Sequence, residues 1–153
     1  YFEEYFGIPI YRQPVVHTID GKKFFIGHGD GLGPGDHGYK FIKKVFANPL
    51  AQWMFARIHP NAGIGMMKYF SKTSRIATGN SDEIYLGDDK EWLIIFSKEV
   101  LQKEHFDFFI FGHRHLPLDK QLGNNSRYIN LGEWLNHQTY AMFDGSNVQL
   151  LRY

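Results

Sequence analysis

The sequence of 153 residues contains no cysteine. This absence excludes a disulfide framework and zinc sites with cysteine ligands, and it is typical of proteins in a reducing compartment. Long apolar runs are also absent, since no stretch approaches the roughly 20 apolar residues that span a membrane. The formal net charge is only +1, so the overall charge gives no reason to expect a nucleic-acid partner. From composition we expect a soluble, cytoplasmic protein.

Apolar residues are abundant in the chain, whereas charge is unevenly distributed. Hydrophobic residues make up 43% of the sequence and aromatic residues 17%, which is enough apolar material for the core of one domain. Acidic residues are absent between Lys40 and Arg75. This basic segment suits an anionic substrate or an anionic membrane surface. Its basic residues are Lys40, Lys43, Lys44, Arg57, Lys68, Lys72 and Arg75.

The order of strand-like and helix-like segments predicts an α/β fold. Residues 1–7 read as the end of a helix closed by Gly7. Alternating and β-branched residues beside Asp-Gly turns are typical of hairpins, one near each end of the chain. We expect strands at 14–19, 22–27, 106–111, 126–131, 138–143 and 149–153, with a two-residue turn at Asp20-Gly21 and a hairpin at Asp144-Gly145.

The middle of the chain shows helical periodicity interrupted by loops. One helix runs from Tyr39 to a break at Asn48-Pro49, and Pro60 is expected to end the next helix. The glycine-rich stretch 29–38 and the polar stretch 78–89 are expected to be loops. The further predicted helices are 50–58, 63–72 and 92–103.

Two strand-like runs end in glycine and histidine, and we interpret them as strand tips at a metal site. Residues 23–30 deliver His28, and residues 107–115 deliver His113 and His115. Neutral imidazoles are good ligands for divalent transition metals, and the adjacent glycines let backbone and ligand approach closely. Residues i and i+2 of a strand point the same way, so His113 and His115 can face one ion. A loop after the strand can instead aim them at two ions.

Residues near the histidines suggest further roles. Asp30 is expected to orient an imidazole, and His37 lies in the glycine-rich loop within reach of the site. The helical region 39–75 holds more apolar residues than one buried face needs. We therefore interpret this region as a cap with an apolar interior and a basic rim, suited to a ligand that is both anionic and lipid-like.

Several motifs resemble those of a known family. Residues 27–30 (Gly-His-Gly-Asp) and 112–115 (Gly-His-Arg-His) are similar to the last two metal motifs of calcineurin-like metallophosphoesterases. Asp36-x-Gly38-Tyr39, the basic helical insert with Ser71-Lys72, and residues 131–134 (Leu-Gly-Glu-Trp) resemble the UDP-2,3-diacylglucosamine hydrolases of lipid A synthesis. The resemblance extends over most of the chain from about residue 20.

The resemblance implies a four-layer αββα sandwich, a helical cap at 39–75 and two divalent metal ions, expected to be Mn²⁺. His28 and His113 would bind one ion and His115 the other. A metal-bridging hydroxide is the expected nucleophile, so no side chain is assigned a catalytic role. It would cleave the pyrophosphate of UDP-2,3-diacylglucosamine to UMP and a diacylglucosamine 1-phosphate. The substrate-binding residues implied are Asp36, Tyr39, Ser71, Lys72 and Arg75.

The other metal motifs of that family, Asp-x-His, Gly-Asp and Gly-Asn-[His/Arg]-Asp, have no counterpart before His28. Residues 1–7 resemble the helix that follows the third of them. We therefore expect 1–153 to be one partial domain, the C-terminal part of a larger enzyme, with an incomplete site and no activity alone. A complementing N-terminal segment or a second copy of the chain is the expected partner.

Two other functions stay open at the level of sequence. One is a general metallophosphoesterase that hydrolyses soluble phosphodiesters, which the apolar, acid-free insert disfavours. The other is a non-catalytic module that binds lipid or a membrane surface through the helices of 39–75. If the chain belongs instead to a hydrolase of UDP-2,3-diacylglucosamine, we expect that enzyme to be peripheral at the inner membrane, where its UDP-diacyl-sugar substrate resides. A nucleic-acid role is the weakest candidate, because the basic segment is helical and apolar, has no recognisable binding fold, and the overall charge is small.

Overall fold

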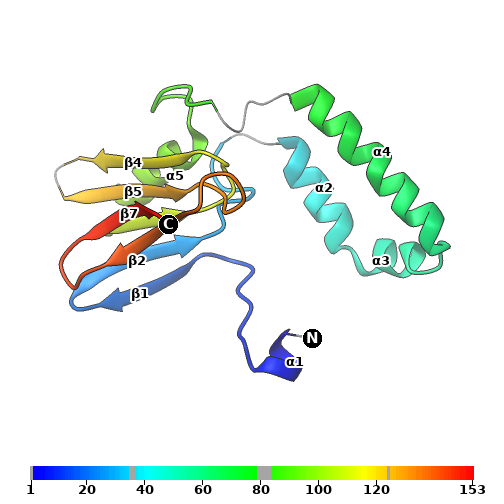
Figure 1. The fold of residues 1–153 in the computed structure, drawn as a ribbon, viewed down its shortest axis with the longest axis horizontal. Helices are drawn as coiled ribbons and strands as arrows, with labels where there is room; N and C mark the ends of the chain where they lie inside the picture. Colours follow the sequence, from blue (N-terminus) through cyan, green and yellow to red (C-terminus); the bar gives the residue numbers. More distant parts are fainter. Residues whose placement is uncertain (1, 35–36, 79–83, 124) are drawn as a thin grey trace.

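The computed structural model of the chain describes residues 2–34, 37–78, 84–123 and 125–153. Figure 1 shows a strand-rich body and a group of helices beside it. The strands are β1 (Val15–Ile19), β2 (Lys22–Gly27), β3 (Phe108–Phe111), β4 (Pro117–Leu122), β5 (Ser126–Leu131), β6 (Thr139–Phe143) and β7 (Val148–Arg152). The helices are α1 (Phe2–Phe6), α2 (His37–Ala47), α3 (Pro49–Phe55), α4 (Pro60–Thr78) and α5 (Trp92–Leu101).

The strands of the described residues form a five-stranded sheet of order β1-β2-β3-β5-β4 and a two-stranded sheet, β6-β7. The three central strands β2, β3 and β5 run parallel, while the outer strands β1 and β4 are antiparallel to their neighbours. Parallel strands covered on both faces read as continuous apolar runs, as in 108–111 (Phe-Phe-Ile-Phe). Asp20 and Gly21 both have positive φ, which matches the twist of the tight turn between β1 and β2.

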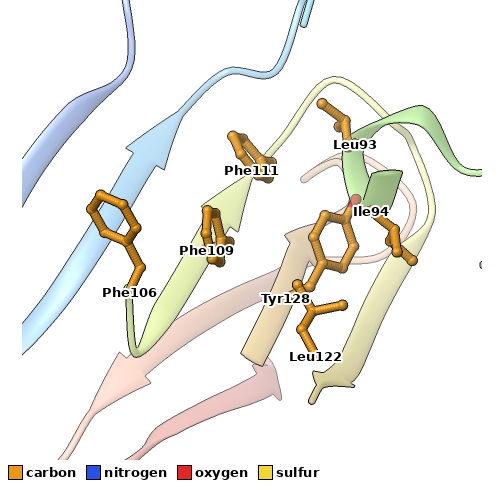
Figure 2. Packing of buried hydrophobic residues seen from close by; sticks show 7 residues of the cluster. All are labelled: Leu93, Ile94, Phe106, Phe109, Phe111, Leu122 and Tyr128. Atoms are coloured by element: carbon orange, nitrogen blue, oxygen red, sulfur yellow. The ribbon is translucent and has the colours of Figure 1, made fainter. Parts of the chain in front are cut away.

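The five-stranded sheet has a hydrophobic core on each face. Figure 2 shows the core beneath α5, where aromatic side chains of β3 and β5 pack against Leu93 and Ile94. On the opposite face, alternate residues of the same strands pack against the β6-β7 hairpin. The first cluster contains Leu93, Ile94, Phe106, Phe109, Phe111, Leu122 and Tyr128, and the second Phe24, Phe108, Ile129 and Val148.

The order of layers confirms the α/β class predicted from the sequence. In the described residues, α5, the five-stranded sheet and the two-stranded sheet lie one upon another, with a core on each face of the central sheet. These are three of the four layers of an αββα sandwich. Strand β1 is an exposed edge, and Val16 and Ile19 are among its solvent-facing apolar residues.

The region predicted to form a cap consists of α2, α3 and α4. These helices extend away from the sheet on the side where the parallel strands end (Figure 1). The Asn48 side chain accepts hydrogen bonds from the backbone N–H groups of Leu50 and Ala51, so Asn48 caps α3 while Pro49 begins it. The apolar face of α2 is not buried, since Phe41 is 68% exposed and Phe46 52%. The division of the chain into a domain and a cap stays a prediction.

Several boundaries predicted from the sequence were wrong. Pro60 does not end a helix but is the first residue of α4, because proline is well suited to the first helical turn, where its missing N–H removes no bond. Strand β4 was not predicted, because it begins with Pro117 and carries Asp119 and Lys120 among its residues. Such a sequence is typical of an edge strand, the position that β4 occupies. Helix α4 also extends beyond the predicted 63–72, and residues 79–83 lie outside the described part.

None of the helices in the described ranges combines the length and hydropathy that crossing a bilayer requires.

Replacement of Phe109 by alanine should destabilise the fold far more than the same change at Phe41. Phe109 is fully buried under α5 while Phe41 is 68% exposed. A buried Phe→Ala change costs about 3–5 kcal/mol, and an exposed one lies within about 0.5 kcal/mol. Urea unfolding of both variants measures the difference. Equal losses would show that the apolar face of α2 belongs to the core.

The turn between β6 and β7 should make stability depend on pH in acid. Asp144 accepts hydrogen bonds from the backbone N–H groups of Asn147 and Ser146, which lower the pKa of its carboxyl to about 2. A lowered carboxyl pKa gives stability that is present above the ordinary value and is lost as pH falls through about 2. The melting temperature of Asp144→Ala should therefore lie below that of the unaltered chain at pH 6, and the gap should close towards pH 2.

The control for this measurement is Glu99→Gln, which changes an exposed carboxylate on α5. Its melting temperature should follow that of the unaltered chain across the same range. A gap for Asp144→Ala that stays constant between pH 6 and pH 2 would contradict the assignment.

Candidate metal centre

The parallel pairing of β2 and β3 brings the two histidine motifs to one edge of the sheet. Gly27 lies opposite Phe111 in the register, so His28 and Gly112 are the first residues beyond the two strand tips. The Gly112 N–H donates to the His28 carbonyl at 3.1 Å, which extends the ladder by one more bond. The rings of His28 and His113 lie 5.3 Å apart between centroids and meet edge to face at 76°.

Glycine is required where these tips approach each other. A Cβ atom on Gly112 would lie 3.4 Å from Nδ1 of His28. Gly29 has a φ of +104°, and a Cβ there would meet Leu93 of α5 at 3.0 Å and the Cβ of His113 at 3.5 Å. Larger residues would therefore push the histidine loops apart or away from α5.

The loop after β3 turns its side chains in alternate directions. Arg114 is buried, with 4% of its surface exposed, whereas His113 is half-buried and His115 is exposed. His113 adopts a φ of +61°, a left-handed conformation that is uncommon outside glycine. This geometry turns the middle residue of the motif inward and leaves its two histidines towards the solvent side of the strand tip.

A buried amide joins the tips of β3 and β5. The Asn130 side chain donates to the Gly112 carbonyl at 2.8 Å and accepts from the Gly132 N–H at 3.0 Å. Asn130 is fully buried, so both bonds are shielded from water. Gly132 has a φ of +71°, and a Cβ there would lie 2.7 Å from Cγ of Pro117. Asn130 therefore fixes the position of the chain just before His113.

The arrangement of His28 and His113 is compatible with two ligands of one metal ion. An imidazole nitrogen binds zinc at about 2.1 Å, so two rings on one ion have centres roughly 5 Å apart. The observed 5.3 Å between ring centroids agrees with that spacing. Across the described ranges, however, no cluster of three or more His, Asp or Glu residues is placed to hold an ion. The described part of the chain thus offers a pair of imidazoles rather than a complete site.

A hollow of about 490 Å³ adjoins His28, between the segment before β1 and the tip of β2. Arg12, His17 and Lys43 contribute to its lining and make it basic. Lys43 of α2 forms an ion pair with Asp30 at 2.5 Å. This ion pair ties the loop after β2 to the first helix of the cap, while the predicted role of Asp30 in orienting an imidazole stays a prediction.

Four of the five predicted substrate-binding residues, Tyr39, Ser71, Lys72 and Arg75, belong to the cap helices. Asp36 is outside the described residues, as are the side chains of Tyr39 on α2 and Arg75 on α4. Ser71 and Lys72 lie on α4 and line an apolar groove between α3 and α4 with a volume of about 960 Å³. The other residues of this groove are Phe55, Ile58, Pro60, Gly63, Ile64, Met67 and Lys68.

The structure therefore divides the predicted site residues into two groups. His28, His113 and His115 stand at the strand tips, while Ser71 and Lys72 belong to helices that extend away from the sheet (Figure 1). His37, which was considered within reach of the site, is the exposed first residue of α2. The chain thus presents a histidine pair and an apolar groove with lysines at its wall, connected through the loops on either side of the cap.

Two buried polar residues at the site were not identified from the sequence. No role was assigned there to Arg114, and Asn130 was placed only within a predicted strand. No local signal indicates that the arginine between the two histidines is buried. No sequence signal distinguishes Asn130 from an ordinary strand residue.

Comparison with known proteins agrees with the geometry. No protein-family model matches the chain. A curated protein named UDP-2,3-diacylglucosamine hydrolase from Porphyromonas gingivalis is 32% identical over 162 residues, which cover 98% of this chain and 62% of that protein. Proteins of the same name from Shewanella sp. and Shewanella baltica are 27% and 25% identical and are covered to 52% and 58%.

The chain spans between about half and two thirds of the length of these relatives, and almost the whole of it takes part in the best of these matches. Both histidine motifs fall in the matched region, because the Porphyromonas alignment leaves out only 2% of the chain. By its sequence, the chain is similar over almost its whole length to proteins named UDP-2,3-diacylglucosamine hydrolase, and these relatives support its assignment to that family of metallophosphoesterases.

Proposed function

We propose that the chain supplies one part of a metal-dependent hydrolase that cleaves the pyrophosphate of UDP-2,3-diacylglucosamine, giving UMP and a diacylglucosamine 1-phosphate. The observation that carries this proposal is the contact of His28 and His113 at the tips of two parallel strands. The names of the relatives supply the substrate, because each is a UDP-2,3-diacylglucosamine hydrolase.

His28 and His113 would hold one divalent ion, and His115 would bind a second, both proposed to be Mn²⁺. Two such ions supply a hydroxide of low pKa and neutralise the phosphoryl oxygens of the substrate. Imidazole ligands carry no charge, so they leave the ions electropositive. The chain's own contribution is to keep the rings in place through Gly112 and the buried amide of Asn130.

The cap would bind the lipid part of the substrate. The groove between α3 and α4 is apolar along Ile58, Ile64 and Met67 and has Lys68 and Lys72 at its wall. A diacyl sugar phosphate combines the same two properties, acyl chains and negative charge. Asp36, Tyr39, Ser71, Lys72 and Arg75 are proposed as contacts to the sugar and phosphate region.

The exposed apolar side chains of the cap also suit a membrane surface. Phe41, Leu50, Trp53 and Phe70 are each more than half exposed, and the segment from Lys40 to Arg75 contains basic residues without acidic ones. Aromatic side chains insert into the interfacial region while lysines attract anionic headgroups. We propose a peripheral location on the cytoplasmic side of the inner membrane, from which the lipid substrate is taken up.

The metal centre is proposed to be completed by residues outside this chain. The described residues provide two touching imidazoles and no cluster of three ligands. An N-terminal segment or a second copy of the chain would add the carboxylates that a bridged pair of ions requires. Alone, the 153 residues are proposed to bind metal weakly and to be inactive.

A second candidate is a non-catalytic module that binds lipid or a membrane surface. The exposed apolar helices of the cap favour it, because they need no metal to act. The two candidates differ in whether metal binding matters. If the chain is part of a hydrolase, His28, His113 and His115 are essential for its activity. If it is a lipid-binding module, their replacement leaves binding to lipid unchanged.

The metal site makes a direct prediction. His28→Ala and His113→Ala should each weaken Mn²⁺ binding to the chain at least tenfold, because each removes one of two ligands on one ion. Electron paramagnetic resonance of Mn²⁺ titrated into the chain measures the affinity. His105→Ala serves as the control, since His105 is exposed beside Asp107 at the opposite end of the sheet. Unchanged affinity in both site variants would exclude the pair as ligands.

The cap groove makes a second prediction. Ile64→Asp should weaken binding of UDP-2,3-diacylglucosamine at least tenfold and leave binding of UDP unchanged, since a carboxylate would enter the apolar groove. Tyr69→Asp, which changes a 68% exposed residue of α4 that does not line this groove, is the matched control. Isothermal titration calorimetry with both ligands provides the comparison. If the unaltered chain bound the two ligands equally, a soluble phosphodiester would become the better substrate assignment.

A further inference from the structure

Arg114 has a role in the histidine loop that the metal-binding pattern does not assign. Its guanidinium lies beneath the loop and is almost fully buried, at 4% exposure. The Arg114 N–H also donates to the Gly112 carbonyl at 2.7 Å, which closes a tight turn at His113. This turn places His113 at a φ of +61°, directly before the buried Arg114.

The guanidinium connects this loop to the chain that leaves the cap. Nη2 of Arg114 donates to Oε1 of Glu91 at 3.0 Å and to the Ile84 carbonyl at 2.8 Å. The guanidinium carbon also lies 5.9 Å from the centre of the Trp92 ring. Ile84 and Glu91 are the two ends of the described part of the connection between α4 and α5, so one side chain joins this part, residues 84–91, to the histidine loop.

Glu91, the last residue of this segment, also forms hydrogen bonds within the segment and to α5. It is 2% exposed, and its Oε1 accepts the Leu86 N–H at 3.3 Å. Its backbone N–H donates to the Gly87 carbonyl at 3.1 Å, and its carbonyl accepts the first hydrogen bond of α5 from Ile95 at 3.0 Å. Glu91 is therefore fixed by α5 and by the segment before it, which makes it a rigid partner for Arg114.

The segment that leads into the cap, residues 29–34, also contacts the start of α5. A Cβ on Gly33 would lie 2.6 Å from the Trp92 carbonyl oxygen, and one on Gly29 would lie 3.0 Å from Leu93. The described parts of the two connections, 29–34 and 84–91, therefore both contact residues Glu91 to Leu93 at the start of α5. Arg114 links these residues to the histidine loop.

We propose that Arg114 is a positioning residue that orients His113 and His115 and couples their loop to segment 84–91 at the base of the cap. The orientation towards metal rests on the proposed function, whereas the coupling of the two segments rests on the contacts of Arg114 alone. Binding of a ligand in the cap would then change the geometry of the histidine loop, and binding of metal would restrict the base of the cap. Such coupling is reciprocal by linkage.

Arginine suits this role better than lysine. Its planar guanidinium bonds a carboxylate and a carbonyl together and lies over an aromatic ring, whereas lysine offers a compact charge. Arg114→Lys keeps the buried charge opposite Glu91 and removes the planar guanidinium, whose Nη2 bonds both Glu91 and the Ile84 carbonyl. A neutral residue at position 114 would leave the buried Glu91 carboxylate without a positive partner. Arg114→Lys avoids that loss, so its effects report on the orientation of the histidine loop.

The test is amide hydrogen exchange of the metal-free chain, followed by Mn²⁺ titration. In Arg114→Lys, exchange should become at least tenfold faster in both 112–116 and 84–91 and stay unchanged in the β6-β7 hairpin. Mn²⁺ affinity should fall at least tenfold. Arg127→Lys is the control, because Arg127 also bonds a carboxylate, that of Asp119, elsewhere on the same sheet. It should alter neither segment.

A double variant, Arg114→Met with Glu91→Leu, tests the same link without a buried unpaired charge. It should keep the melting temperature near that of the unaltered chain and still show faster exchange in both segments. Exchange that rises uniformly through the chain in Arg114→Lys, or rises in only one of the two segments, would overturn the coupling. If the unaltered chain bound no Mn²⁺, the proposed function would fail, and the exchange data would still decide the coupling.

Discussion

The structure depends on the parallel pairing of β2 with β3. This pairing buries two aromatic-rich strands between α5 and the β6-β7 hairpin, and it sets Gly27 opposite Phe111. Burial on both faces leaves the strands no freedom to slip, because a shift of one residue would exchange the two core faces. The position of His28 beside His113 follows from this register. A centre built from residues 85 positions apart in the sequence is thus fixed by the hydrophobic effect before any metal contributes.

Around these strand tips, the polar interactions orient the loops that carry the histidines, whereas hydrophobic burial drives folding. Asn130 joins β3 to β5, and the Arg114–Glu91 pair connects the histidine loop to the start of α5. Both are buried, so each bond is protected from water and costly to break. The cap differs in kind, because its helices expose much of their apolar surface. A rigid centre beside an apolar, basic cap is the combination that a lipid-linked diphosphate substrate would need.

The sequence predicted what repeats along the chain and missed what depends on distant neighbours. Asp-Gly turns, the run 108–111 and the helices of the cap carry periodic patterns, and the structure confirms these elements. Strand β4 was missed because its residues alternate weakly and begin with Pro117, and only pairing with β5 makes it a strand. The histidines were recognisable by their glycine neighbours. Arg114 was not, because its partner Glu91 is 23 residues away and nothing local indicates a buried ion pair.

The central claim is that this chain provides the histidine ligands and lipid cap of a UDP-2,3-diacylglucosamine hydrolase. The most direct test is a chimera in which the chain replaces the matching region of the Porphyromonas gingivalis relative. UMP released from UDP-2,3-diacylglucosamine would be measured with and without Mn²⁺. The account predicts Mn²⁺-dependent release that is abolished by His113→Ala. A folded chimera that binds Mn²⁺ and the substrate but releases no UMP would contradict it.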